Sequence, residues 1–225
     1  MKSPVNMPPA WLYSLVQKIF AGLGWLLLRQ EVRGRENLLA QGPFLLAFNH
    51  LSMVDAPLLL IHVPRQMVGM MTDKYAQSPF IGWLANLMGA LWVARGEADL
   101  NAIKASLGHL RSGGILAISP EGTRSPSGQL LKGKTGVAYL ATRTGVTIVP
   151  VGLAGSEKVF DNARRLRRTP VKLTFGEPFT LPADSRAKSE KLEEYTEVIM
   201  RRIAALLPPE YRGEYAEAVA LPQAR

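Results

Sequence analysis

The sequence predicts an α/β fold in which a largely parallel central sheet is flanked by helices. Apolar segments of strand length alternate along the chain with longer segments whose apolar residues recur every three or four positions. This alternation is typical of parallel sheets, because a crossover helix joins each strand to the next. With 225 residues, 47% of them hydrophobic, the chain is long enough to bury a sizeable core.

The first predicted element is an amphipathic helix over residues 10–29. Apolar residues such as Trp11 and Leu15 recur at helical spacing, while Gln17 and Lys18 lie on the opposite face. The segment fits a signal peptide poorly, and its polar centre disfavours a membrane-spanning helix. We expect it to lie in a membrane interface, although a helix packed on the domain's own core would show the same pattern.

The remaining elements follow in order and divide the chain into three parts. Strands are predicted over residues 43–49, 66–72, 90–94, 115–119, 146–153 and 171–179. Helices are predicted over residues 80–89, 98–114, 136–145 and 189–207, the third with Gly145 as its C-cap. The parts are an N-terminal membrane-associating segment (1–35), an α/β domain (36–207) and a C-terminal extension (208–225).

Composition narrows the possible partners and chemistry. The 27 basic and 18 acidic residues give a net charge of +9, which suits nucleic acid, anionic lipid or phosphorylated substrates. The sequence shows neither a basic stripe with interleaved aromatics nor a nucleic-acid fold signature, so we expect no nucleic-acid partner. It has no cysteine, which excludes disulfides, zinc–thiolate sites and a thiol nucleophile.

A polar motif interrupts the apolar run LLAFNHLSMVDAPLLL. His50 ends a predicted strand, and Asp55 opens the next helix, either as its N-cap or as the capping-box partner of Ser52. If the loop folds back, Asp55 can fix the tautomer of His50, as it would for a general base. With no cysteine and no G-x-S-x-G elbow, the group deprotonated would be a substrate hydroxyl. The alternative is a buried structural histidine that is hydrogen-bonded to a cap aspartate.

A second polar stretch, ISPEGTRSPSGQLLKGKTG, begins within the strand predicted over residues 115–119 and extends beyond it. Strand ends in open α/β sheets are where ligands bind. Arg124 offers a planar fork for a phosphate, Lys132 a point charge, and the next helix a positive N-terminus. The alternative is a solvated turn with a Glu121–Arg124 surface pair. A third stretch, GALWVARG, is an apolar strand that ends in Arg95.

Together these stretches resemble the glycerolipid acyltransferases, the 1-acylglycerol-3-phosphate acyltransferase family. NHLSMVD is similar to the family's N-H-x-x-x-x-D motif, GALWVAR to its second block, PEGTRS to its third and IVPVGLAG to its fourth, in the same order. The resemblance covers about residues 40–155. It implies transfer of a fatty acyl group from an acyl thioester to the free hydroxyl of 1-acylglycerol 3-phosphate, which gives phosphatidic acid.

The resemblance also implies roles for individual residues. His50 is the catalytic base, and Asp55 orients it. The implied substrate-binding residues, of which the cations hold the acceptor's phosphate, are Arg95, Glu121, Gly122, Thr123, Arg124 and Lys132. The resemblance implies no metal and no resident cofactor. The acyl donor is a thioester of coenzyme A or acyl carrier protein, and the other partners are lysophosphatidic acid and the lipid bilayer.

Lipid substrates imply a peripheral or monotopic location on the cytoplasmic membrane, with the active site facing the cytoplasm. The stretch ARRLRR (163–168) could bind anionic headgroups or could be a solvated loop. FIGWLANLMGALW could line an acyl tunnel, with Gly82 and Gly89 leaving room, or could be core. The alternative functions are acylation of glycerol 3-phosphate or another lysolipid, thioester or lipid hydrolysis, and lipid binding without catalysis.

Overall fold

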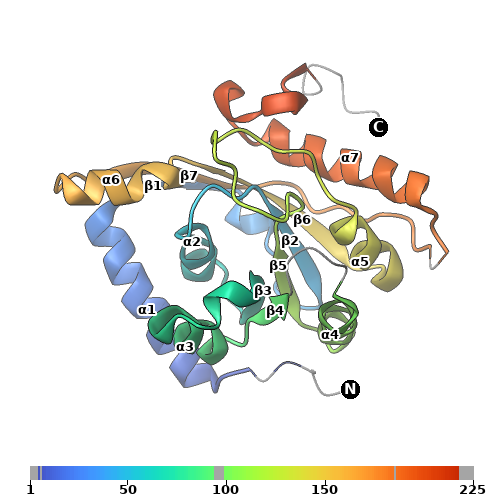
Figure 1. The fold of residues 1–225 in the computed structure, drawn as a ribbon, viewed down its shortest axis with the longest axis horizontal. Helices are drawn as coiled ribbons and strands as arrows, with labels where there is room; N and C mark the ends of the chain where they lie inside the picture. The colour runs from blue at the N-terminus through green and yellow to red at the C-terminus, as the bar shows by residue number, and fades with distance from the viewer. Residues whose placement is uncertain (1–4, 6, 94–98, 185, 218–225) are drawn as a thin grey trace.

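The computed structural model has one seven-stranded sheet with helices on both faces (Figure 1). The structure describes residues 5, 7–93, 99–184 and 186–217. The strands lie in the order β1 (Leu28–Arg33), β7 (Thr169–Phe175), β6 (Thr147–Ala154), β2 (Phe44–Phe48), β5 (Ile115–Ile118), β3 (Met67–Thr72) and β4 (Leu91–Val93). Every neighbouring pair is parallel except β6 and β7, which are antiparallel. The predicted fold class, α/β with a largely parallel sheet, is confirmed.

The predicted helices and strands occur in the predicted order, and two further elements, β1 and the short helix Val159–Arg164, were not predicted. The helices are α1 (Ala10–Leu27), α2 (Asp55–His62), α3 (Pro79–Leu87), α4 (Leu100–Arg111), α5 (Gly136–Thr144), α6 (Val159–Arg164) and α7 (Ser189–Ala205). Gly145 follows α5 in the left-handed conformation, with φ 67°, as its predicted C-cap role requires.

The central strand β2 is buried on both faces, which explains its unbroken apolar sequence. Phe44, Leu46 and Phe48 pack on the face covered by α1 and α2, whereas Leu45 and Ala47 pack on the face covered by α4, α5 and α7. A parallel strand buried between two helical layers carries apolar residues at every position. The chain therefore leaves β2 at the carboxyl edge of the sheet, with His50 two residues beyond it.

Helix α1 is apolar but mostly exposed. Tyr13 and Val16 are buried toward the sheet, and α1 packs beside α2. The outer face carries large exposed apolar side chains, namely Trp11, Leu15, Ile19, Leu23, Trp25 and Leu26. The mean hydropathy of α1 is 1.2 and 17% of it is buried, and its length and composition are sufficient to cross a membrane. Packing on the domain's own core therefore accounts for only one side of this helix.

Both ends of the chain contribute to the α/β domain. Strand β1 lies within the segment assigned to membrane association, yet it pairs in parallel with β7 as an edge strand of the sheet. Two 3₁₀ turns at Pro209–Tyr211 and Gly213–Tyr215 lie in the segment assigned to a C-terminal extension. Tyr211 and Tyr215 are buried in the core cluster beneath α7. The folded domain thus extends past α7 to residue 215 at least.

Candidate active site

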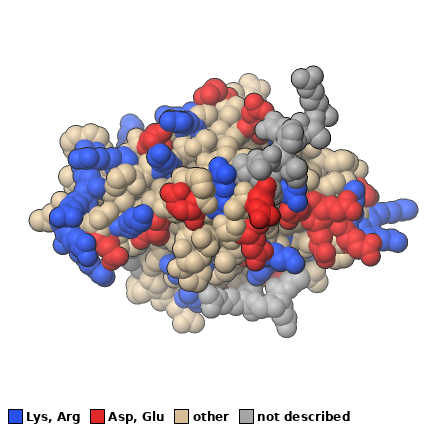
Figure 2. All heavy atoms as spheres, turned by 90° about the horizontal axis from the view of Figure 1, so that it is seen from above, with Lys and Arg blue, Asp and Glu red and all other residues tan. Residues whose placement is uncertain are grey.

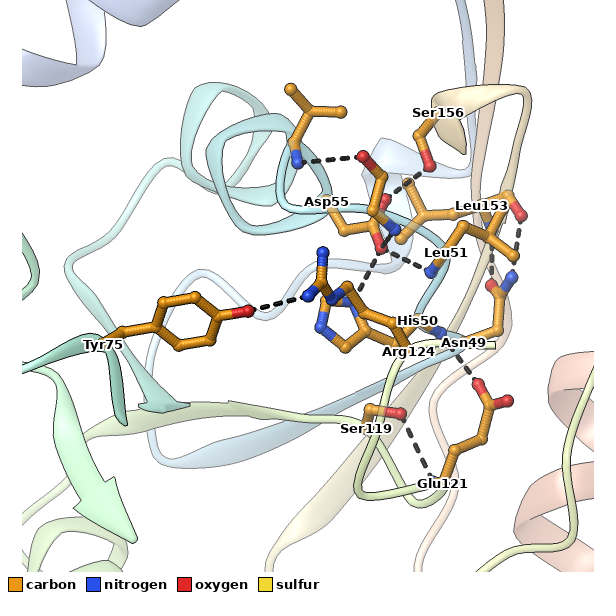
Figure 3. Close-up of polar contacts among 12 residues, drawn as sticks. Asn49, His50, Leu51, Asp55, Tyr75, Ser119, Glu121, Arg124, Leu153 and Ser156 are labelled. Carbon is orange, nitrogen blue, oxygen red and sulfur yellow. Dashed lines mark hydrogen bonds and ion pairs between the residues drawn. The ribbon is translucent and has the colours of Figure 1, made fainter. Parts of the chain in front are cut away.

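His50 and Asp55 meet in the loop between β2 and α2 (Figure 3). The Nδ1 atom of His50 lies 2.8 Å from Oδ2 of Asp55. The Asp55 side chain is fully buried, whereas that of His50 is 27% exposed. When Nδ1–H donates to the carboxylate, Nε2 keeps its lone pair and can accept a proton. The partial exposure of the ring argues against a purely structural histidine.

The Asp55 carboxylate also fixes the loop that carries His50. Its Oδ2 atom accepts hydrogen bonds from the backbone N–H groups of Leu51 at 2.7 Å and Ser52 at 2.8 Å. Asp55 is the first residue of α2, so its prediction as the N-cap is wrong, because the carboxylate bonds backwards along the chain. The capping-box alternative is closer to the observed geometry. Asp55 accepts from the N–H of Ser52, and Ser52 Oγ accepts from the N–H of Val54 at 3.5 Å.

Ser156 is a fourth donor to the same carboxylate. Its hydroxyl lies 2.5 Å from Oδ1 of Asp55, and the residue is fully buried. It follows Gly155, whose φ is +88° and where a Cβ would lie 2.3 Å from the carbonyl oxygen of Pro170. The sequence offered one signal for this contact: the fourth block ends in a glycine just after a strand, where ligands and site residues gather. Sequence reasoning nevertheless missed Ser156.

Asn49 fixes the point at which the chain leaves β2. Its side-chain amide donates to the carbonyl of Leu153 at 2.8 Å and accepts from the N–H of Leu153 at 2.7 Å. Asn49 is buried, and these two side-chain bonds satisfy the backbone N–H and C=O of Leu153, which would otherwise be unpaired. The amide therefore extends the β2–β6 pairing by one step and holds the residue before His50 in place.

The third block holds the backbone of His50 from the opposite side to Asp55 (Figure 3). Glu121 is buried and accepts from the N–H groups of His50 at 2.8 Å and Leu131 at 2.9 Å. The N–H of Ser125 donates to the carbonyl of His50 at 2.8 Å. Burial raises the pKa of Glu121, and the bonds from Leu131 and His50 oppose that rise. The alternative of a Glu121–Arg124 surface pair is wrong, because Glu121 faces buried backbone.

Arg124 belongs to the loop that binds His50, and its side chain is exposed. Its guanidinium donates to the hydroxyl of Tyr75 at 2.7 Å, a partner that the sequence did not indicate. Lys132 is also exposed. Arg95 lies outside the residues that the structure describes.

Gly122 and Thr123 shape the exposed turn before Arg124. The φ of Gly122 is +66°, which favours glycine, and a Cβ there would lie 3.2 Å from the Nζ of Lys134. Lys134, which sequence reasoning passed over in favour of Lys132, is thus a cation directly beside this turn. The turn and its neighbouring cations form an exposed, positively charged rim next to the His50 loop.

Three other sequence features lie apart from this site. A Cβ on Gly82 would lie 2.5 Å from the carbonyl oxygen of Ala76, so this glycine allows α3 to pack closely rather than opening an acyl tunnel. His109 is buried with its Nε2 3.1 Å from the carbonyl of Ile115, and burial lowers its pKa. Burial likewise lowers the pKa of His62 to about 4. Among the described residues, no three histidine or carboxylate side chains gather as metal ligands.

The fold and the site together define an α/β protein whose site contains a histidine suited to general-base chemistry. A partly exposed histidine, oriented by a buried aspartate at the carboxyl edge of a parallel sheet, is suited to take a proton from a bound hydroxyl. Among the described residues, the His50 ring is hydrogen-bonded to Asp55 and to no serine hydroxyl that could serve as a nucleophile. The exposed cations of the neighbouring turn suit an anionic group on the same ligand.

Comparison with known proteins identifies the family. The family model described as Acyltransferase matches residues 29–154, and the chain belongs to this family. It is 27% identical over 187 residues to a 1-acyl-sn-glycerol-3-phosphate acyltransferase of Chlamydomonas reinhardtii, covering 82% of this chain and 54% of that protein. It is 28% identical over 178 residues to the Bacillus subtilis enzyme of the same name, covering 78% and 87%.

A solved structure has the same fold. The 1-acyl-sn-glycerophosphate acyltransferase PlsC from Thermotoga maritima superimposes with a TM-score of 0.66 and 26% sequence identity, covering 83% of this chain and 76% of that chain. The chain spans about half the length of several of the curated relatives, among them the Chlamydomonas protein at 54%. The resemblance read from the four sequence blocks is therefore confirmed at the level of family and fold.

Proposed function

We propose that the protein transfers a fatty acyl group from an acyl thioester to the free hydroxyl of 1-acylglycerol 3-phosphate, which gives phosphatidic acid. His50 Nε2 takes the hydroxyl proton as the oxygen attacks the thioester carbonyl. The tetrahedral intermediate then expels the thiolate, which takes the proton from the His50 imidazolium. A thioester is already activated, so positioning and one base can suffice without an acyl-enzyme.

The geometry of the His50–Asp55 pair is the observation that carries this proposal. The 2.8 Å contact to a fully buried carboxylate orients the ring and favours the imidazolium that forms during attack. The names of the relatives from Chlamydomonas and Bacillus support the same acceptor and reaction. Coenzyme A or acyl carrier protein would be the thiol carrier of the donor.

Phosphate recognition would fall to the exposed cations beside the His50 loop. Arg124 can make two parallel bonds to phosphate oxygens, and Lys132 and Arg95 are the other cations that the sequence blocks imply. Glu121 would act by shaping this region, since its carboxylate is occupied by backbone N–H groups. The N–H groups of residues 50–52 are likewise engaged by carboxylates, so the oxyanion donor would be another group.

The bilayer would be reached through the exposed face of α1. An apolar helical face with Trp11 and Trp25 near its ends suits a helix lying in the interface. The protein would then be monotopic, and its active site would face the cytoplasm. Deleting residues 1–30 would remove half of β1, so substitutions on the helix face are the better test. Leu15→Ser together with Leu23→Ser should weaken co-flotation with liposomes, and unchanged flotation would place the contact elsewhere.

The reaction is tested by thiol release from acyl-coenzyme A, with and without lysophosphatidic acid. Wild type, His50→Ala and the control His62→Ala are compared. Release that requires the acceptor, disappears in His50→Ala and persists in His62→Ala would support the proposal. Release without acceptor would favour the alternative of a thioesterase or lipid hydrolase.

The acceptor is tested by exchanging lysophosphatidic acid for glycerol 3-phosphate or a neutral lysolipid in the same assay. Faster turnover with either would favour the alternative acyltransferase specificities. Arg124→Ala should raise the KM for lysophosphatidic acid more than it lowers kcat. An unchanged KM would remove Arg124 from the phosphate site.

A further inference from the structure

The turn between α6 and β7 exposes an apolar side chain within a cluster of arginines. We call residues 164–168 the arginine turn. Leu166 is 96% exposed, more than any other large hydrophobic residue that the structure describes. It is also the one non-glycine residue in the described ranges with a positive φ, at 55°. A leucine is unfavourable both in this backbone conformation and in water, so neither local geometry nor packing explains its presence.

The arginine turn is nevertheless an ordered structure. The N–H groups of Arg165 and Arg167 both donate to the carbonyl of Asn162, at 3.0 and 2.9 Å, and that of Leu166 donates to Ala163 at 3.0 Å. These bonds hold the backbone so that Leu166 stands out from the surface. Nothing in the described fold covers its side chain.

The charge around Leu166 is largely unneutralised. Arg164 lies 3.7 Å from Asp161, but Arg165 and Arg167 form no ion pair with any residue in the described ranges. Figure 2 shows Lys and Arg side chains gathered at the end of the molecule that carries α6 in Figure 1. This end of the surface therefore favours an anionic partner.

The arginine turn is continuous with the exposed face of α1. Arg168 donates to the backbone carbonyls of Trp25 and Leu28, and its guanidinium lies 5.9 Å from the centre of the Trp25 ring. Trp25 is 73% exposed, and Phe160 on α6 is 52% exposed. An exposed apolar side chain of α1 thus contacts the arginine turn, and α6, which leads into that turn, exposes another.

We infer that the arginine turn is a second membrane contact, at which Leu166 inserts into the bilayer and the arginines bind the phosphates of anionic lipid headgroups. An exposed apolar side chain flanked in the sequence by arginines matches the depth profile of a lipid interface, with apolar chains below and phosphates above. A nucleic-acid partner would satisfy the charge but leave the leucine uncovered, and continuity with the apolar face of α1 favours a lipid surface over a protein partner. The inference rests on the proposed membrane location and not on acyl transfer.

The test is binding of the full-length protein to liposomes of phosphatidylcholine, with and without phosphatidylglycerol. Leu166→Asn removes the apolar side chain but suits a positive φ, so the fold is maintained or stabilised. We expect its partition coefficient to fall roughly tenfold on anionic vesicles. A purely structural role for Leu166 would leave binding unchanged, and that result would overturn the insertion.

The charge is tested by Arg165→Gln combined with Arg167→Gln. At about fivefold for each arginine, binding to anionic vesicles should fall about 25-fold, with little change on phosphatidylcholine alone. The control, Arg111→Gln with Arg201→Gln, removes the same charge from α4 and α7, which Figure 1 places away from α6. An equal loss in the control would overturn a specific site, as would a loss of nucleic-acid binding with vesicle binding intact.

Turnover of a soluble short-chain lysophosphatidate separates this inference from the proposed function. These variants should retain wild-type rates on that substrate, because they alter only the membrane contact. If the wild type fails to turn it over but the vesicle results hold, the reaction is wrong and the lipid site stands. If turnover is normal and the variants bind vesicles like wild type, the lipid site is wrong and the reaction stands.

Discussion

The Glu121→Gln substitution tests whether Glu121 shapes the site or contacts the substrate. The substitution preserves the shape of the side chain but replaces one carboxylate oxygen with an NH₂ group. Both oxygens accept buried N–H groups, from His50 and Leu131, so the NH₂ group must face one of them. One donor is then left without an acceptor whichever way the amide is oriented.

The expected loss of stability follows from these two bonds. A hydrogen bond to a charged group contributes about 1.5–3 kcal/mol, and relief of the buried charge offsets part of this loss. We expect the free energy of unfolding to fall by about 2 kcal/mol, which lowers Tm by about 4–8 °C in a chain of this size.

The pH dependence gives a second measure of the same substitution. Burial raises the pKa of Glu121 above its ordinary value of 4.5, so the folded state takes up this proton more readily than the unfolded chain. The contribution of Glu121 to stability is therefore present at low pH and is lost as pH rises through the raised pKa. The stability gap between wild type and Glu121→Gln should widen as pH falls through the raised pKa toward 4.5.

Urea unfolding at several pH values and steady-state kinetics test this reasoning together. We expect lower stability and a reduced kcat, because the His50 backbone shifts, with little change in the KM for lysophosphatidic acid. Glu197→Gln, a partly exposed position on α7 that pairs with Arg201, serves as the control. A large rise in KM at unchanged stability would refute the shaping role and place Glu121 in contact with substrate.

Three further predictions concern other polar contacts. Ser156→Ala removes a donor to the buried Asp55 carboxylate, so we expect a loss of about 2 kcal/mol in stability and a reduced kcat at unchanged KM. Ser156→Thr keeps the hydroxyl and should recover both. Wild-type kinetics in Ser156→Ala would contradict this. Asn49→Ala leaves the buried N–H and C=O of Leu153 unpaired and should lower the free energy of unfolding by about 3–4 kcal/mol in urea; a loss below about 1 kcal/mol would mean that water replaces the amide. The pKa of His62 is lowered from 6.5 to about 4, so as pH falls this group protonates first in the unfolded chain. After allowance for solvent screening, wild type should lose about 2 kcal/mol more free energy of unfolding than His62→Gln between pH 7 and 4. Parallel pH profiles of stability would contradict this.

The fold was predictable because its strands and helices carry unambiguous patterns. FLLAF is apolar throughout because β2 is buried on both faces. The apolar positions of α7 are periodic because only one face of this helix is buried. Strand β1 escaped prediction because LRQEVR carries charges typical of an exposed edge, and its place was fixed by pairing with β7. Helix α6 has only six residues, too few to establish a period.

The candidate site was predictable only where its residues are near in sequence. His50 and Asp55 are five apart, so a single loop can bring them together. Asp55 and Ser156 are 101 residues apart, and Glu121 lies 71 residues from His50. Those contacts depend on which strands become neighbours in the sheet, and no local pattern of apolar residues encodes that order.

The direct passage from α1 into β1 has a mechanical consequence. The helix ends at Leu27 and the strand begins at Leu28, while Gly24 packs against Gln30 and Ile61. Because no connecting residue separates them, we expect α1 and the sheet to move as one rigid body. Any tilt of the helix in a bilayer would turn the carboxyl edge of the sheet through the same angle, so membrane thickness and curvature would set how His50 is presented to lipid substrates.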